Sequence, residues 1–184
     1  MKFFVVLSVW SCMAIQSLAA LPSQITLLRG AETEGGGLST KGKERLAAFV
    51  PYFDNSPELK GHGAPGAIYV LGTAKEGGEG GAMEMAKALA DHYKLTVITT
   101  YTRSDYKKMV DEIKKDADLN GRHVVICWDP SQIPDITRAF GAFQSFATWR
   151  KDDYDHVWIV TLAPNGKASF QRLPQRLLFG DSPR

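Results

Sequence analysis

The sequence predicts an α/β domain, built as a three-layer sandwich with a mostly parallel sheet and an antiparallel hairpin at one edge. Short apolar segments alternate with amphipathic segments of roughly 10 to 15 residues, a pattern typical of parallel βαβ units. The last apolar segment is followed instead by a turn and another strand, which indicates a hairpin. A chain of 184 residues, 44% of them hydrophobic, suits one core, so we expect a single domain over residues 20–184.

The first half of this domain should contribute three strands and two helices. Ser39 or Thr40 is the expected cap of the first helix, whose apolar stripe runs through Leu46, Phe49 and Val50. The expected elements are a strand at 24–29, a helix at 39–52, a loop at 54–66, a strand at 67–71, a helix at 82–93 and a strand at 95–99.

The second half continues the alternation and closes with the hairpin. Pro164, Asn165 and Gly166 form the turn signal between the last two strands. The expected elements are a helix at 105–116, a strand at 123–127, a helix at 134–140, a strand at 157–162 and a returning strand at 167–173.

Residues 1–19 have the features of a signal peptide. Lys2 precedes an apolar run that is about half the roughly 20 residues needed to cross a bilayer, and small residues lead to an expected cleavage near Ala19. Cys12 would leave with this segment, so the mature chain would hold only Cys127 and no internal disulfide. We expect a secreted protein with no membrane anchor and with an inert, buried Cys127.

Composition and spacing exclude several kinds of site. The 22 basic residues are interspersed with 20 acidic ones, so nucleic-acid binding is not expected. The four histidines show no pair at a metal-ligand spacing, and neither a metal nor a cofactor is expected. The glycine-rich loop "GTAKEGGEGG" lacks the registers of a P-loop and of a dinucleotide site, so it and Gly35–Gly37 are interpreted as mobile connectors.

Sites in open α/β sheets lie beyond the carboxyl ends of the strands. Three such segments are present here: Arg29 to Glu32, the loop from Gly72 to Gly81, and Trp128 to Ser131.

These segments resemble the histidine phosphatase superfamily, also called phosphoglycerate mutase-like. "ITLLRGAETEGGGLSTKGKERLAAF" is similar to the family's opening, in which a strand ends in Arg-His-Gly/Ala-Glu and a Leu-Ser/Thr-x-x-Gly-x-x-Arg helix start follows. Leu38, Ser39, Gly42 and Arg45 fit that spacing. "GAMEMAKALADHYKL", "VVICWDPSQIPDITRAFG" and "YDHVWIVTLAPNGKASFQRLPQRLLFGD" resemble the family's next helix, its later strand and the closing hairpin of some members. The resemblance implies a phosphoglycerate mutase-like fold.

The family's chemistry requires a histidine nucleophile, two arginines, a second histidine and a carboxylic acid. By this resemblance Arg29 matches the first arginine, whereas Gly30 stands at the nucleophile, Gly81 at the second arginine and Asp129 at the second histidine. The chain is therefore identified as a divergent member that lacks both catalytic histidines. The remnant pocket would contain Arg29, Gly30, Glu32, Gly81, Trp128, Asp129 and Ser131.

A carboxylate at position 129 opposes phosphate binding. Two like charges about 4 Å apart cost roughly 4 kcal/mol at an effective dielectric of 20. Two interpretations of the pocket follow: an Arg29–Asp129 ion pair closes it, or Glu32 and Asp129 act beside Arg29 as an acid and a base.

The leading hypothesis is a secreted pseudoenzyme that recognises a protein, a glycan or a small molecule. The first alternative is an enzyme that reuses the pocket for non-phosphoryl acid/base chemistry with Glu32 and Asp129. The second is a weak phosphatase, in which Arg29, Glu32 and Asp129 would carry any activity.

Overall fold

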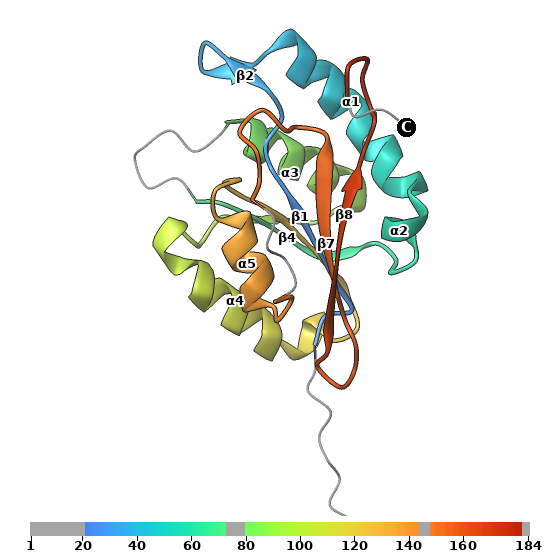
Figure 1. Ribbon diagram of the computed structural model, residues 1–184, viewed down its shortest axis with the longest axis vertical. Coiled ribbons are helices and arrows are strands. Elements are labelled where there is room, and N and C mark those ends of the chain that lie inside the picture. The colour runs from blue at the N-terminus through green and yellow to red at the C-terminus, as the bar shows by residue number, and fades with distance from the viewer. Residues whose placement is uncertain (1–20, 73–79, 144–147, 182–184) are drawn as a thin grey trace, which may run out of the picture.

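The computed structural model describes residues 21–72, 80–143 and 148–181, and it confirms the expected α/β sandwich (Figure 1). A six-stranded sheet has the order β5-β4-β6-β1-β7-β8. Strands β5, β4, β6 and β1 are parallel, and β7 and β8 complete the sheet with antiparallel pairings. The strands are β1 (Gln24–Leu28), β4 (Pro65–Val70), β5 (Val97–Ile98), β6 (His123–Cys127), β7 (His156–Leu162) and β8 (Ala168–Pro174). The predicted signal peptide lies outside the described residues.

Helices cover both faces of the sheet (Figure 1). Consecutive strand residues point to opposite faces, so Leu27 packs with α4 and α5 while Leu28 packs with α1 and α3. Both faces are apolar, which is why the central strands are continuous hydrophobic runs. The helices are α1 (Thr40–Asn55), α2 (Pro57–Lys60), α3 (Gly80–Tyr93), α4 (Tyr106–Lys115) and α5 (Ile133–Ala139).

Two segments that were expected to be loops contain regular structure. Helix α1 runs on to Asn55, and the short helix α2 follows within the expected loop at 54–66, because Pro57 at its start already has a helical φ. The glycine run at 35–37 is not a loose connector but part of a tight hairpin between β2 (Thr33–Glu34) and β3 (Gly37–Leu38). Gly35 and Gly36 have φ values of 59° and 86°, as a type I′ turn requires.

The ends of several strands meet at one edge of the sheet. The carboxyl ends of β1, β4 and β6 lie there, and so does the start of β7, because Leu27 of β1 pairs with Trp158 in antiparallel register. The end of β8 reaches the same edge, since Pro174 pairs with His156.

Within residues 21–72, 80–143 and 148–181, no helix has both the length and the apolar character that a bilayer span needs.

Candidate functional site

Asp129 is a structural residue of the turn that leads from β6 into α5. Its Oδ1 accepts hydrogen bonds from the amide and the hydroxyl of Ser131, both at 2.7 Å. Its Oδ2 forms an ion pair with Arg103. The carboxylate therefore holds the turn closed, as Asp side chains do at helix entries, and is itself neutralised. Asp129 is buried, and only 5% of its surface is exposed.

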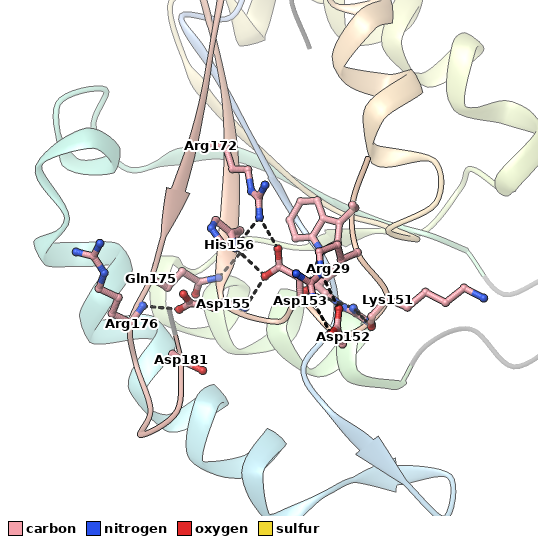
Figure 2. Close-up of polar contacts among 12 residues, drawn as sticks. Arg29, Lys151, Asp152, Asp153, Asp155, His156, Arg172, Gln175, Arg176 and Asp181 are labelled. Atoms are coloured by element: carbon pink, nitrogen blue, oxygen red, sulfur yellow. Dashed lines mark hydrogen bonds and ion pairs between the residues drawn. The ribbon is translucent and has the colours of Figure 1, made fainter. Parts of the chain in front are cut away.

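Arg29 does not pair with Asp129, and the hypothesis of an ion pair between them is wrong. Its Nη1 donates to the backbone carbonyl oxygens of Lys151, at 2.6 Å, and Asp153, at 3.3 Å (Figure 2). The guanidinium carbon lies 3.6 Å from the centroid of the Tyr154 ring, within cation–π distance. The segment before β7 thus supplies backbone acceptors for Nη1 in place of an anion, whereas Nε is buried with no hydrogen-bond partner in the part of the chain that the structure describes.

Gly30 and Gly81 make close backbone contacts at the positions where the resemblance places the nucleophile and the second arginine. A Cβ atom on Gly30 would lie 2.4 Å from the amide nitrogen of Ala82. A Cβ atom on Gly81 would lie 2.2 Å from the carbonyl oxygen of Ala31. The turn after β1 is therefore pressed directly onto the start of α3, with backbone against backbone. Glycine is required at both positions because no side chain fits between them.

Glu32 belongs to a buried ion-pair triad with Arg45 and Asp181. Arg45 donates from Nε and Nη2 to the Glu32 carboxylate at 2.8 to 3.1 Å, and from Nη1 and Nη2 to Asp181 at 3.0 and 2.8 Å. The Asp181 carboxylate also accepts from the backbone amides of Leu177 and Leu178. The triad ties the turn after β1, helix α1 and the C-terminal segment together.

The triad keeps its carboxylates ionised. Burial alone would raise the pKa of Glu32, but the hydrogen bonds and the charge of Arg45 outweigh burial, so the pKa lies below its usual value. The same balance lowers the pKa of Asp181. Glu32 is therefore poorly suited to act as a general acid near neutral pH.

The remaining predicted pocket residues lie on either side of this region. Trp128 is fully buried in the core beneath α4 and α5, and its Nε1 donates to Gln132 at 3.0 Å. Ser131 is exposed and bonds Asp129. The structure thus brings Gly30 and Gly81 together, whereas Glu32 and Asp129 are each held by a different arginine.

A cavity of about 360 Å³ opens beside the closed pocket. We call it the polar cavity. Its walls come from the turn after β1, the start of α1, the segment before β7, strand β8 and the C-terminal turn. It is lined by Glu32, Lys41, Arg45, Arg150, Asp152, Asp153, Tyr154, Asp155, His156, Arg172, Gly180 and Asp181.

Most of this wall was not predicted from the sequence. Of the seven predicted pocket residues, all of which are described, Glu32 lines the polar cavity and the other six do not. Arg45 stood out in the sequence through its spacing from Ser39, but Asp153, His156 and Arg172 carried no signal. No group of three or more His, Cys, Asp or Glu side chains is arranged to hold a metal ion in the part of the chain that the structure describes.

Comparison with known proteins provides evidence on the fold. No protein-family model matches the sequence, and no curated protein does. Phosphoglycerate mutase from Plasmodium falciparum is similar in structure, with a TM-score of 0.51 and 16% identity over 88% of this chain and 97% of that one. SixA from Agrobacterium tumefaciens, named as a phosphohistidine phosphatase, has a TM-score of 0.49 and 13% identity over 83% and 99% of the two chains. The protein histidine phosphatase SixA complexed with tungstate has a TM-score of 0.46 and 12% identity over 83% and 97%. The likeness to the mutase confirms the phosphoglycerate mutase-like fold.

Proposed function

We propose that this chain is a secreted, catalytically inactive member of the histidine phosphatase superfamily that acts by binding a ligand or a partner. The observation that carries the proposal is the backbone contact of Gly30 with the start of α3. A covalent route through histidine needs an imidazole at this point and space for a phosphoryl group beside it. The contact leaves room for neither.

Arg29 supports the same conclusion. In the family that the sequence resembles, the matching arginine holds phosphate, and its donors must then face an open pocket. Here Nη1 of Arg29 is hydrogen-bonded to the carbonyl oxygens of Lys151 and Asp153, and the ring of Tyr154 covers the guanidinium. A phosphate bound at Nη1 would have to displace the chain's own backbone.

The acid/base alternative requires two carboxylates that share a substrate and exchange protons with it. Both oxygens of Glu32 accept from Arg45, and both oxygens of Asp129 are engaged, by Ser131 and by Arg103. Carboxylates held in this way stabilise the fold better than they serve as proton carriers. We therefore favour binding over acid/base catalysis.

A phosphatase assay tests the proposal. The purified chain, residues 20–184, should show no hydrolysis of p-nitrophenyl phosphate above that of buffer, and no phosphohistidine after incubation with phosphoryl donors. The variant Gly30→His restores the missing residue type, but it should remain inactive and lose stability because its Cβ meets Ala82 at 2.4 Å. Turnover that Asp129→Ala abolishes would overturn the proposal.

Secretion has a separate test. The full chain expressed in a secreting eukaryotic cell should appear in the medium with an N-terminus near residue 20, which N-terminal sequencing would read. Retention in the cell with residues 1–19 intact would contradict this part of the proposal.

A further inference from the structure

The carboxylates deep in the polar cavity are already satisfied by the chain itself. Asp153 accepts from Nδ1 of His156 at 2.7 Å and from Nη2 of Arg172 at 2.9 Å (Figure 2). Glu32 and Asp181 are held by the arginine between them. These acceptors have little capacity left for a ligand that only donates hydrogen bonds.

The donors of the polar cavity have capacity to spare. The ammonium group of Lys41 makes no hydrogen bond to any described residue, and neither does the hydroxyl group of Tyr154. Arg172 uses Nη2 on Asp153, which leaves its Nε and Nη1 for another acceptor, and 36% of its side chain is exposed. Guanidinium and ammonium groups both bind carboxylates through charge-assisted hydrogen bonds. The open hydrogen-bonding capacity therefore calls for a ligand rich in oxygen acceptors.

The charge balance limits how negative that ligand can be. Five carboxylates and four Lys or Arg side chains line the polar cavity, a balance of one negative charge with His156 neutral. A dianion such as phosphate would meet repulsion from these carboxylates. A ligand with one carboxylate and several hydroxyl groups fits better, because it carries less charge and its hydroxyl oxygens can accept from the donors that the chain leaves open.

The volume of the polar cavity and the residues near its rim favour a molecule rather than a simple ion as its ligand. A volume of about 360 Å³ is in the range of small-molecule sites and exceeds what a bare carboxylate fills. Phe179 is fully exposed and stands next to Gly180, which lines the polar cavity. The turn is fixed by the hydrogen bond from the Asp181 amide to the Leu178 carbonyl oxygen, and by a φ of 86° at Gly180. An exposed aromatic ring next in sequence to a lining residue is suited to pack against the carbon face of a ring sugar that reaches it.

From these contacts we infer that the polar cavity binds a small hydroxylated carboxylic acid of the sugar-acid class. Lys41 and Arg172 would hold the carboxylate, Tyr154 would donate to a hydroxyl oxygen, and Phe179 would pack against the carbon face. The inference rests on the proposed binding function and names its ligand class.

Isothermal titration with sodium glucuronate, at constant ionic strength, tests the inference on residues 20–184. We expect saturable binding that Lys41→Gln weakens by about 3- to 10-fold, as the loss of one charged hydrogen bond predicts. Lys43→Gln is the matched control, because it removes the same charge from the same exposed turn of α1 but from a residue that does not line the polar cavity. It should leave the affinity unchanged.

Several results of these titrations would overturn the inference. Equal binding of glucose and glucuronate would overturn the carboxylate assignment, and so would equal effects of the two lysine variants. No binding of glucuronate at millimolar concentrations would overturn the inference outright. The phosphatase assay on the same sample decides the proposed function independently: absence of both binding and turnover defeats this inference alone, whereas turnover that Asp129→Ala abolishes defeats the proposed function.

Discussion

Replacing Arg45 with methionine should destabilise the fold more than any exposed charge change. The side chain of Arg45 is 2% exposed, and those of its partners Glu32 and Asp181 are 13% and 4% exposed. The substitution leaves two carboxylates buried without their cation, and breaking a buried pair in this way costs about 3 to 5 kcal/mol. For a domain of this size that loss lowers the melting temperature by about 6 to 20 °C.

Urea unfolding followed by tryptophan fluorescence and circular dichroism would measure the change in the free energy of unfolding. Arg150→Met is the control, because Arg150 and its partner Asp152 are both 70% exposed, and solvent screening should leave stability within experimental error. The triple variant Glu32→Gln, Arg45→Met, Asp181→Asn should recover part of the loss, since no buried charge then lacks a partner.

Two results would refute this reasoning. A loss below about 1 kcal/mol for Arg45→Met would mean that the carboxylates find other partners or water at little cost. A triple variant less stable than Arg45→Met would mean that the polar side chains stabilise the fold by more than mutual neutralisation.

Three further predictions concern residues outside the triad. Burial lowers the pKa of His123 to about 4, so between pH 6.5 and 4 the unfolded chain takes up a proton that the folded chain refuses, and stability should fall by about 3 kcal/mol across this window as the pH drops. Urea titrations at several pH values would measure this slope, which His123→Gln should flatten. Burial raises the pKa of Cys127 to about 12, so its thiol should resist alkylation in the folded protein and react in urea, as mass spectrometry would show. Asp129→Ala should cost about 1 to 2 kcal/mol of stability in urea unfolding, because the turn loses its hydrogen bonds from Ser131; an unchanged midpoint would contradict the structural role assigned here.

Local sequence patterns predicted the order and type of the main elements. Strand β6 has the predicted bounds, and the other main strands and helices lie within about three residues of those expected. Apolar runs and helical stripes are local patterns, and burial on both faces of a parallel sheet makes them strong. The short helix α2 and the β2–β3 hairpin were missed because each is only a few residues long and shows no hydrophobic period.

How the polar residues pair with one another depends on the tertiary fold. Arg29, Glu32 and Asp129 all follow the carboxyl ends of strands, yet each has partners distant in sequence: Lys151 for Arg29, Asp181 through Arg45 for Glu32, and Arg103 for Asp129. Charge pairing is not local, so any of 22 basic side chains could in principle meet any of 20 acidic ones. Which pairs form depends on how the loops cross the sheet edge, and a pattern of residue types along the chain does not contain that geometry.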